Sequence, residues 1–372
     1  MPALLPKIIV SVTNDLTTDQ RVKKVCATLQ NSGFEIILIG RRLPESITLK
    51  RSYQTIRLKN FFNKGFLFYA EYNLRLFFKL LTLKGDVLLA NDLDTLLPNF
   101  LVSRLKSKKL VYDSHELFTE VPELNNKRFV RNFWLNLEKS LLPRLQIMYT
   151  VNRPLADYFQ EKYPIPVEII LNVPNRIDRI HIDDSFVDKV KGTKKMLIIQ
   201  GRGLNMDRGL EEAVSMMKFL ENYILYIIGD GDVIPNIRKM IRDERLEDKV
   251  HLLPPMPYEE LIQYTCIADL GLTLDKPTNL NYEWSLPNKL FDYIQCRVPV
   301  LASNRKLVSE IVLKNDIGLV VNSFDPEYLS TQVSSIFANE KLLQQWRINL
   351  EKVAPNYVWE NQEKKLIQIF TR

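Results

Sequence analysis

Short runs of Val, Ile and Leu alternate with amphipathic stretches along almost the whole chain. Five runs in the first part of the chain predict buried strands, at residues 7–13, 34–40, 86–90, 109–113 and 147–151. The stretches between them have helical periodicity, at residues 19–31, 64–84, 93–106 and 128–142. Continuous apolar strands that alternate with helices are typical of a parallel sheet that is covered on both faces.

The same pattern starts again in the second part of the chain. A further strand at 167–175 ends in a Pro/Asn turn, and a polar connector follows it up to Lys194. Beyond the connector, helical stretches separate six apolar runs: MLIIQG, YILYIIG, KVHLL, ADLGLTL, VPVLAS and IGLVVN. The pattern therefore predicts two α/β units, roughly 1–172 and 190–350, with a helix in the tail after Trp359.

Length and composition agree with a two-domain soluble protein. The chain has 372 residues, of which 46% are hydrophobic and 26% charged. It has three widely separated cysteines, Cys26, Cys266 and Cys296, which predict reduced thiols rather than a disulfide framework. No secretory signal and no uncharged apolar run of about 18 residues is present, so we expect a cytoplasmic protein.

The positive charge is concentrated in one segment. The net charge is +7, and residues 41–84 alone contain ten Lys and Arg against two Glu. The second half of this segment also contains many Phe, Tyr and Leu, a combination typical of helices that lie on a membrane surface. The segment is therefore a candidate for attachment to an anionic membrane, on the inner face. The alternative is an ordinary core helix with a basic solvent face.

Ligands of parallel α/β sheets bind beyond the carboxyl ends of the strands, so candidate functional residues are expected directly after each predicted strand. After the first strand, TNDLTTDQRV has no Gly-x-Gly-x-x-Gly motif. Its Asn14 and Asp15 favour a turn, and Thr18 or Asp19 can cap the next helix. The functional interpretation is that this loop lines a ligand cleft. After the strand at 109–113, His115 stands with Asp113 and Glu116, a setting that makes a functional histidine as plausible as a structural one.

Two stretches of the second unit point to a phosphate. IIQGRGLNMDRGLEE places Arg202 and Arg208 in a glycine-containing turn, and guanidinium groups suit phosphate. EWSLPNKLFDY predicts a helix with Ser285 as its cap and Pro287 in its first turn. Free N–H groups at such a helix start bind phosphate.

Residues within this helix predict contacts to a nucleotide. Lys289, Asp292 and Tyr293 share one face by their spacing. Lys289 would meet a phosphate, and Asp292 would accept from ribose hydroxyls. The alternative is an ordinary surface Lys–Asp pair.

The sequence does not predict a metal site. It has no His-x-x-x-His or Cys-x-x-Cys motif. Asp-x-Asp occurs at Asp92–Asp94 and at Asp230–Asp232, and such a pair can hold a divalent ion. Both copies lie at predicted strand–helix turns, where Asp is a common helix cap, and we interpret them as caps.

Several stretches, taken in order, resemble one known family. GRGLNMDRGLE, IIGDGDVIPNI, KVHLLPPMPYEELIQYTCIADLGLTL and SLPNKLFDYIQCRVPVLAS resemble the C-terminal half of family 4 (group 1) glycosyltransferases. VTNDLTTDQRVKKVCATLQNSGFEIILIG, ANDLDTLLP and YDSHELFTE resemble the bacterial branch of the same family. The final YVWENQEKKLIQIF is similar to the helix that crosses back to the first domain in that family.

This resemblance implies a GT-B fold, in which two Rossmann-like parallel-sheet α/β domains face each other across a cleft. The implied parts are an acceptor-side N-terminal domain (1–172), a linker (173–193), a nucleotide-sugar-binding domain (194–352) and a C-terminal helix (353–372) that crosses back. The implied enzyme is a retaining, metal-independent hexosyltransferase without a cofactor. It moves a sugar from a nucleotide-sugar donor to a glycan or lipid-linked acceptor, in the synthesis of cell-surface polysaccharide or glycolipid.

The resemblance also implies roles for residues of the second unit. Asp292 takes the place of the second acid of the family's Glu-x7-Glu motif, which holds the donor ribose. Arg208 and Arg202 match the basic pair on the diphosphate, although their interval is one residue longer than usual. Ser285 and Leu286 take the place of the backbone donors to the diphosphate.

Roles for the remaining residues follow from the same resemblance. His115 matches the histidine near the transferred sugar, and Asn14 and Asp15 occupy the loop beside donor and acceptor. Glu283 stands one residue before the expected first acid of the motif. Either the loop is one residue longer and Glu283 serves as that catalytic acid, or the first acid is absent.

Two other functions were weighed against this one. A sugar-nucleotide epimerase of the same fold would release a changed nucleotide-sugar without any acceptor. A basic nucleic-acid-binding protein would stack bases on the aromatic residues of 61–78. No nucleic-acid-binding module is present and that function leaves the two-unit pattern unexplained, so we predict no nucleic-acid partner.

Overall fold

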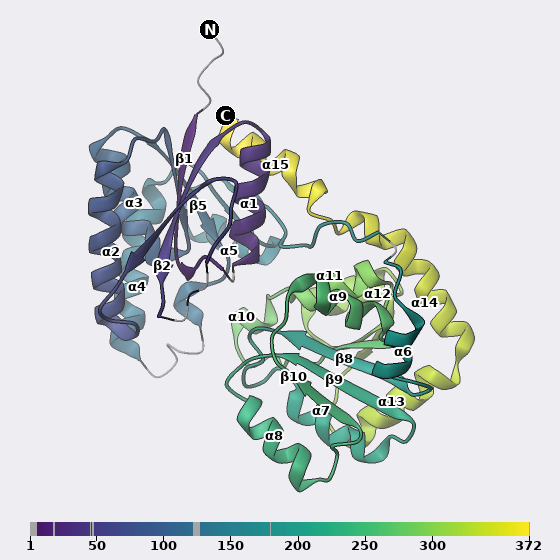
Figure 1. The fold of residues 1–372 in the computed structure, drawn as a ribbon. Helices are drawn as coiled ribbons and strands as arrows, with labels where there is room; N and C mark the ends of the chain where they lie inside the picture. Colours follow the sequence, from purple (N-terminus) through teal and green to yellow (C-terminus); the bar gives the residue numbers. More distant parts are fainter. Residues whose placement is uncertain are drawn as a thin grey trace. The chain divides into compact units, whose positions relative to one another are not determined.

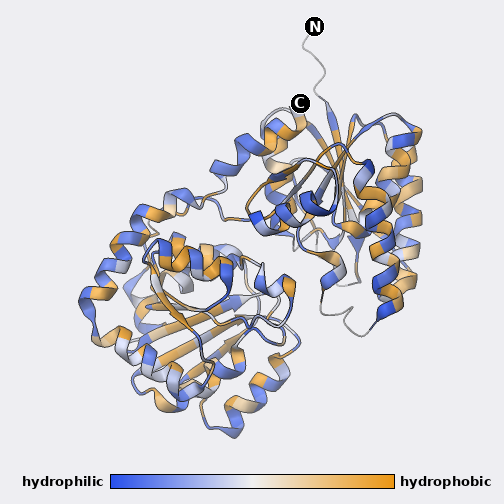
Figure 2. Ribbon diagram, turned by 180° about the vertical axis from the view of Figure 1, so that it is seen from behind, coloured by the Kyte–Doolittle hydropathy of each residue, from blue (hydrophilic) through white to orange (hydrophobic). Residues whose placement is uncertain are grey.

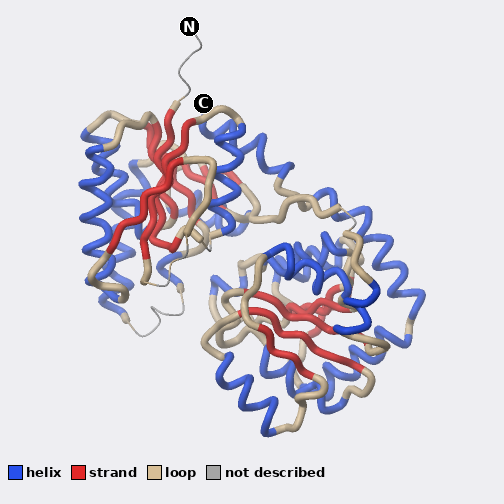
Figure 3. The backbone as a smooth tube through the Cα atoms, viewed as in Figure 1, coloured by secondary structure: helices blue, strands red, loops and turns tan. Residues whose placement is uncertain are grey.

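The chain forms two compact units in a computed structural model that describes residues 6–17, 19–44, 46, 48–121, 127–178 and 180–371. Unit 1 comprises Met1–Asn172 together with Gln362–Arg372, and unit 2 comprises Val173–Asn361. Figure 1 traces both units along the chain, and Figure 3 shows a sheet with helices around it in each.

Unit 1 is built on a seven-stranded parallel sheet with the order β3-β2-β1-β4-β5-β6-β7. Its strands are β1 Lys7–Asp15, β2 Glu35–Arg42, β3 Gln54–Lys59, β4 Val87–Asn91, β5 Lys109–Ser114, β6 Met148–Thr150 and β7 Val167–Ile169. All the strands predicted in this part of the chain are present, although β7 is shorter than expected. The sequence did not predict β3, because this strand is half-exposed at the sheet edge and its sequence QTIRLK has no apolar run.

Helices cover both faces of this sheet. Figure 1 shows α2, α3 and α4 on one face and α1, α5 and α15 on the other. These helices are α1 Gln20–Asn31, α2 Gly65–Thr82, α3 Leu93–Leu105, α4 Arg128–Leu141, α5 Arg153–Lys162 and α15 Glu360–Thr371. The predicted cap is confirmed for Asp19, whose side chain accepts from the backbone N–H of Val22. Thr18, the other predicted cap, lies outside the described residues.

Unit 2 contains a six-stranded parallel sheet with the order β10-β9-β8-β11-β12-β13. The strands are β8 Lys195–Gly201, β9 Tyr223–Gly229, β10 Val250–Leu253, β11 Leu270–Thr273, β12 Val300–Ser303 and β13 Gly318–Val321. The helices are α6 Asp184–Val190, α7 Leu210–Met216, α8 Ile234–Asp243, α9 Tyr258–Ile267, α10 Leu280–Glu283, α11 Asn288–Cys296, α12 Lys306–Lys314, α13 Pro326–Ala338 and α14 Glu340–Val353. All six predicted strands are confirmed.

The apolar runs of the sequence form the cores. The strands are the most hydrophobic segments in both sheets (Figure 2). In unit 1 the residues Ile8 to Val10 of β1 are 0–1% exposed, and in unit 2 the residues Leu197 to Ile199 of β8 are completely buried. Burial of the strands on both faces explains why they read as continuous apolar runs rather than as alternating patterns.

The strand order defines one special position in each sheet. In unit 1, β1 lies between β2 and β4. The connection after β1 therefore runs toward β2 on one side of the sheet, and the connection after β4 runs toward β5 on the other side. In unit 2, β8 lies between β9 and β11 in the same way. Loops diverge at such a switch point and leave a crevice beyond the strand ends, where ligands of this class of fold bind.

No helix among the described residues is long and apolar enough to cross a membrane.

Candidate active site

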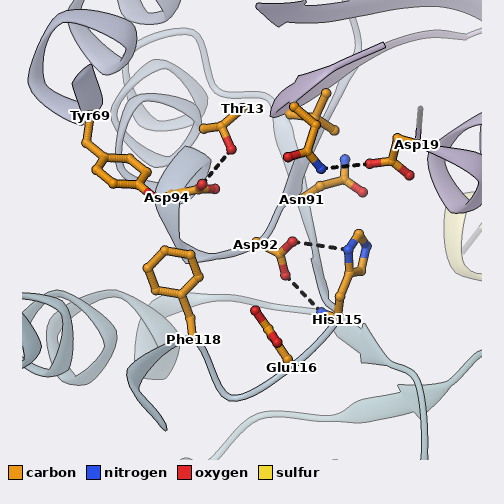
Figure 4. Close-up of a pocket in the computed structure, with 11 residues that line it drawn as sticks. Thr13, Asp19, Tyr69, Asn91, Asp92, Asp94, His115, Glu116 and Phe118 are labelled. Atoms are coloured by element: carbon orange, nitrogen blue, oxygen red, sulfur yellow. Dashed lines mark hydrogen bonds and ion pairs between the residues drawn. The ribbon is translucent and has the colours of Figure 1, made fainter. Parts of the chain in front are cut away.

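Unit 1 has a cavity of about 240 Å³ at its switch point. Its walls come from the ends of β1, β4 and β5 and from the loops and helices next to them (Figure 4). The lining residues are Val12, Thr13, Asn14, Asp19, Tyr69, Asn91, Asp92, Asp94, His115, Glu116 and Phe118. The end of β1 therefore reaches the cavity through Asn14, whose amide donates to Asp19.

Asp15, the neighbour of Asn14, does not line this cavity. Its carboxylate is bound by Arg57 at 2.9 Å, by the hydroxyl of Ser46 and by Thr17. These contacts fix the end of β1 against the sheet edge. The two residues predicted to line the cleft therefore have different surroundings. Asn14 lines the cavity, whereas Asp15 is bonded to neighbouring residues of unit 1.

His115 is held between two carboxylates in the cavity. Its Nδ1 lies 3.1 Å from Asp92, its Nε2 lies 3.1 Å from Asp113, and its backbone N–H donates to Asp92. Burial disfavours the charged imidazole, but the negative charges of Asp92 and Asp113 outweigh it and raise the pKa of His115 well above its usual value. The direction of this shift favours the protonated imidazolium over the neutral base.

The carboxylate that binds Nε2 of His115 is itself part of a buried ion pair, Asp113–Arg21. Asp113 is completely buried and accepts two hydrogen bonds from Arg21, at 3.1 and 2.9 Å. Burial opposes its ionisation, but the charges of Arg21 and His115 hold the pKa of Asp113 well below the usual range. The sequence analysis did not identify Arg21, which lies in the first turn of α1 and meets Asp113 only through the fold.

Asp92 has a backbone conformation that is unusual for a residue with a side chain. It precedes α3 with a φ of 57°, in the left-handed region, and its carboxylate makes no capping hydrogen bond to that helix. The interpretation of Asp92 as a helix cap is therefore wrong, because its carboxylate binds His115 instead. Strained backbone of this kind is concentrated at functional sites.

Asp94 is the most unusual carboxyl group of the cavity. It is 5% exposed, and its Oδ2 accepts from the hydroxyl of Thr13 at 2.6 Å. The other oxygen, Oδ1, has no hydrogen-bond partner among the described residues. Burial, reinforced by the charge of Asp92, raises the pKa of Asp94 to about 8. Like Asp92, it is not a simple helix cap.

The raised pKa of Asp94 predicts that unit 1 loses stability as the pH rises. In the folded chain the carboxyl keeps its proton up to about pH 8, whereas its ordinary pKa is 3.8. The folded state therefore binds more protons in this range, and the free energy of unfolding falls by about 1.4 kcal/mol per pH unit. Asp94→Asn cannot ionise, so it should gain about 2 kcal/mol over wild type between about pH 6 and about pH 8.

Urea unfolding of both proteins at the two pH values measures this difference. Glu161→Gln, at an exposed position on α5, is the matched control and should follow the wild type. An equal pH dependence for Asp94→Asn and wild type would contradict the assignment.

The switch point of unit 2 holds one carboxylate among three cations. Asp275 follows β11 and is completely buried, and it lies 3.0 Å from Arg208, 3.4 Å from Lys289 and 3.3 Å from Arg305. Burial opposes its ionisation, but the charges of Lys289, Arg305 and Arg208 hold the pKa of Asp275 well below the usual range. Three cations against one carboxylate leave a positive excess, which suits an anionic ligand.

Of these cations, Arg208 is the one that is accessible to a ligand. Its side chain is 22% exposed, against 6% for Lys289 and 0% for Arg305. The guanidinium carbon lies 4.1 Å from the ring centre of Tyr282, so the group is held between an aromatic face and Asp275. Arg202, the other predicted arginine, is exposed and forms no ion pair or hydrogen bond with the described residues.

Helix α11 begins differently from the prediction. The helix starts at Asn288 with Pro287 before it, and no side chain caps it. The prediction of Ser285 as the cap is wrong, because the Ser285 hydroxyl donates to the carbonyl of Tyr282 and accepts from Arg305. The Ser285 N–H is also bonded to Tyr282, whereas the Leu286 N–H has no partner among the described residues.

Asp292 is buried on α11 and does not form a surface pair with Lys289. It is 6% exposed and accepts from Gln200 at 2.9 Å and from the hydroxyl of Tyr258 at 2.8 Å. The surface-pair alternative is therefore excluded, since Lys289 turns to Asp275. Tyr293 lies in the core, where its hydroxyl donates to carbonyl groups of the sheet strands.

Glu283 takes part in a helix junction. It ends the short helix α10, and its carboxylate accepts from the backbone N–H of Lys306 at the start of α12. An acid at a helix N-terminus is favourable there. This contact accounts for its position without a ligand, so its catalytic role remains a prediction.

The second Asp-x-Asp pair, Asp230 and Asp232, forms hydrogen bonds to backbone N–H groups of nearby turns. Asp230 accepts from the N–H of Gly231, and Asp232 accepts from the N–H of Met206. No group of three or more His, Cys, Asp or Glu side chains among the described residues is arranged to hold a metal ion.

Comparison with known proteins places both units in one family. Residues 182–353 match the sequence profile described as glycosyl transferases group 1, and residues 19–179 match the profile of glycosyltransferase family 4. The chain is also 29% identical, over 119 residues, to chitobiosyldiphosphodolichol beta-mannosyltransferase of Mus musculus. That match covers 32% of the chain and only 24% of the relative.

Solved structures with low sequence identity share the fold. Sucrose-phosphate synthase from Thermosynechococcus elongatus is 14% identical with a TM-score of 0.79, and the match covers 98% of each chain. Alr3699/HepE of Anabaena, solved in complex with UDP-glucose, is 13% identical with a TM-score of 0.74, covering 98% of this chain and 99% of that one. With two family profiles that between them span most of its length, the chain belongs to the group 1, family 4 glycosyltransferases and has their GT-B fold.

Proposed function

We propose that this protein transfers a sugar from a nucleotide-sugar donor to a glycan or lipid-linked acceptor, without a metal ion and with retention of the anomeric configuration. The observation that carries the proposal is the cluster of Arg208, Lys289 and Arg305 around Asp275. It lies at the switch point of unit 2, where a family member would bind its donor.

The charge of this cluster suits the diphosphate of a nucleotide-sugar. Breaking the bond between sugar and phosphate leaves negative charge on the diphosphate. Fixed positive groups stabilise that charge without reorganisation, which is the usual basis of such catalysis. Arg208 supplies guanidinium hydrogen-bond donors to the diphosphate, and the free N–H of Leu286 adds a backbone donor. The buried Lys289 and Arg305 would contribute positive electrostatic potential without direct contact. A divalent cation is not needed in this account.

The nucleoside part of the donor would be held by α11. Asp292 is pre-oriented by Gln200 and Tyr258, and its carboxylate can accept from ribose hydroxyls. The complex of Alr3699/HepE with UDP-glucose supports a nucleotide-sugar as the ligand class. Arg202 is a further proposed contact to the donor. Ser285, whose N–H and hydroxyl are bonded to Tyr282 and Arg305, would position the neighbouring Leu286 N–H. Glu283 is the remaining candidate for the first acid of the motif.

Unit 1 would contribute the sugar side of the reaction. His115 lines the cavity, and its two ring nitrogens lie against Asp92 and Asp113. It would therefore act on the transferred sugar or the diphosphate through its positive charge rather than through a free N–H. Asn14 and the free oxygen of Asp94 line the same cavity and can bind hydroxyl groups of the donor or acceptor sugar. Front-face attack by the acceptor hydroxyl, which would give retention, is proposed from the family resemblance.

A membrane-bound acceptor is supported by an exposed surface on unit 1. Phe66 of α2 is 66% exposed and meets Phe133 of α4, and Phe129 is 89% exposed. Exposed cations, including Lys64 and Arg128, lie next to them in the sequence. Apolar side chains beside cations favour anionic membrane surfaces. We place the protein on the cytoplasmic face of a membrane, with a lipid-linked saccharide as acceptor.

The double variant Phe66→Ser with Phe129→Ser should bind anionic vesicles at least about tenfold more weakly, because each inserted Phe contributes roughly 1.5–3 kcal/mol when buried. Sedimentation with vesicles of phosphatidylglycerol and phosphatidylcholine at low salt measures the binding. The control is Leu313→Ser on α12, which changes another exposed apolar residue, in unit 2. Vesicle binding that is unchanged in the double variant, or absent in the wild type, would remove the membrane from the proposal.

A thermal-shift screen against UDP-, GDP-, ADP- and TDP-sugars tests the proposed function as a whole. We expect one class to stabilise the protein and to be hydrolysed slowly to the nucleoside diphosphate and free sugar. If no nucleotide-sugar shifts the transition, the donor site is wrong. Conversion of the sugar-nucleotide into an isomer without any acceptor would instead support an epimerase.

A further inference from the structure

Unit 2 brings two of the three cysteines into contact. Cys266 lies near the end of α9 and Cys296 is the last residue of α11, thirty positions later. Their sulfur atoms are 2.6 Å apart. The sequence separation predicted unrelated reduced thiols, and the fold instead makes these two cysteines neighbours.

The two helices are fixed relative to each other before any bond forms between the thiols. At the start of α9, the hydroxyl of Tyr258 donates to Asp292 of α11 at 2.8 Å. The thiol pair lies further along both helices, so a covalent bond would join segments that already pack together. Disulfides form without strain only where the fold holds the two cysteines this close.

The pair is also accessible and has unequal reactivity. Both thiols line a cavity of about 360 Å³ in unit 2, together with Lys191, Asp269 and Arg297. The hydrogen bond from Cys296, together with the charge of Arg297, lowers the pKa of the Cys266 thiol. Burial raises the pKa of Cys296 well above its usual value. Cys266 therefore has the character of an attacking thiolate and Cys296 that of a second, resolving thiol.

Cys26 provides an internal contrast. It is completely buried in unit 1, and burial raises the pKa of its thiol. A buried, protonated thiol is inert toward disulfides. Reaction at Cys26 would therefore report unfolding of unit 1 and not chemistry at the pair.

We propose that Cys266 and Cys296 form a thiol–disulfide exchange site that reacts with small disulfides of the glutathione type. The Cys266 thiolate attacks one sulfur of oxidised glutathione, forming a mixed disulfide and releasing one glutathione thiolate. Cys296 then loses its proton to solvent and attacks the Cys266 sulfur. This second step forms the bond between the two cysteines and releases the second glutathione. Two protein thiols are oxidised and one glutathione disulfide is reduced.

The test uses the full-length protein in glutathione buffers that range from fully reduced to fully oxidised. After each equilibration, free thiols are blocked with iodoacetamide under denaturing conditions, and the mass and the cross-linked peptides are measured. In oxidising buffer we expect only Cys26 to be alkylated and a peptide pair joined through Cys266 and Cys296. Reduced buffer should restore all three alkylated thiols.

Single variants separate the two steps. Cys296→Ser should trap a glutathione adduct on Cys266, because no second thiol can resolve it. Cys26→Ser is the matched control and should form the same bond as the wild type. The proposal is overturned if wild type and Cys26→Ser keep Cys266 and Cys296 fully alkylatable in pure oxidised glutathione, or if the bond formed involves Cys26.

Discussion

Replacing Asp275 with Asn should destabilise unit 2 by about 3–5 kcal/mol, because it removes the only negative partner that the described residues give to a largely buried group of three cations. The carboxylate is completely buried and is the common partner of Arg208, Lys289 and Arg305. Asn keeps the shape of the side chain but removes its charge. The three cations would then repel one another in a low-dielectric setting without compensation.

Chemical unfolding, followed by Trp fluorescence and circular dichroism, measures the loss. Asp243→Asn is the matched control, because it makes the same substitution at an exposed position of α8 in the same unit. Surface changes of this type usually alter stability by less than about 0.5 kcal/mol. If Asp275→Asn unfolds with the same free energy as Asp243→Asn, the cluster does not depend on its central charge. A bound nucleotide-sugar should restore part of the lost stability only if it replaces that negative charge.

Arg208→Ala should weaken binding of the donor by about 10- to 100-fold, since a hydrogen bond to a charged group contributes roughly 1.5–3 kcal/mol. The arginine is the exposed member of the cluster, and Lys289 and Arg305 still neutralise Asp275 in its absence. The variant should therefore fold. This separates the prediction from that for Asp275, where the fold itself is weakened.

Calorimetry with the nucleotide-sugar that gives the largest thermal shift measures the affinity. Arg238→Ala, at an exposed position of α8, removes the same type of side chain outside the cluster and should bind like the wild type. Asp292→Ala should also weaken binding, because it removes the proposed ribose acceptor. Unchanged donor affinity in both Arg208→Ala and Asp292→Ala would refute the donor site.

The fold was largely predictable from the apolar pattern. Strands buried on both faces read as unbroken runs of Val, Ile and Leu, and such runs identified β1, β8 and the other central strands. The edge strand β3 was not predicted, because a half-exposed strand does not need a continuous apolar run. Position within the sheet, rather than strand propensity, decided which strands the pattern could reveal.

The candidate site was only partly predictable. His115, directly after β5, and Arg208, in the turn between β8 and α7, lie in segments that follow strands and could be predicted from that position. Asp275 directly follows the run of β11, and Arg305 follows that of β12, so the same criterion would have included them. Gln200 could also have been identified as a candidate, because a polar residue inside an apolar strand is usually hydrogen-bonded to a partner.

Other parts of the site left no local signal. The pairing of Arg21 with Asp113 joins residues that are 92 positions apart. Ser285 resembles a helix cap in the sequence, yet Arg305 and Tyr282 bind its hydroxyl. Local patterns identify residue types that can act, whereas the partner each residue takes depends on tertiary packing.

The last helix of the chain has a consequence for biosynthesis. Unit 1 comprises Met1–Asn172 and Gln362–Arg372, and Phe370 of α15 packs against Phe34 with ring centres 6.3 Å apart. Domains fold as units while the ribosome extends the chain. Unit 1, although its first 172 residues are made before unit 2, therefore stays incomplete until the C-terminal segment has left the ribosome. A nascent chain of this protein presents the surface under α15 to chaperones for the whole time that unit 2 is being synthesised.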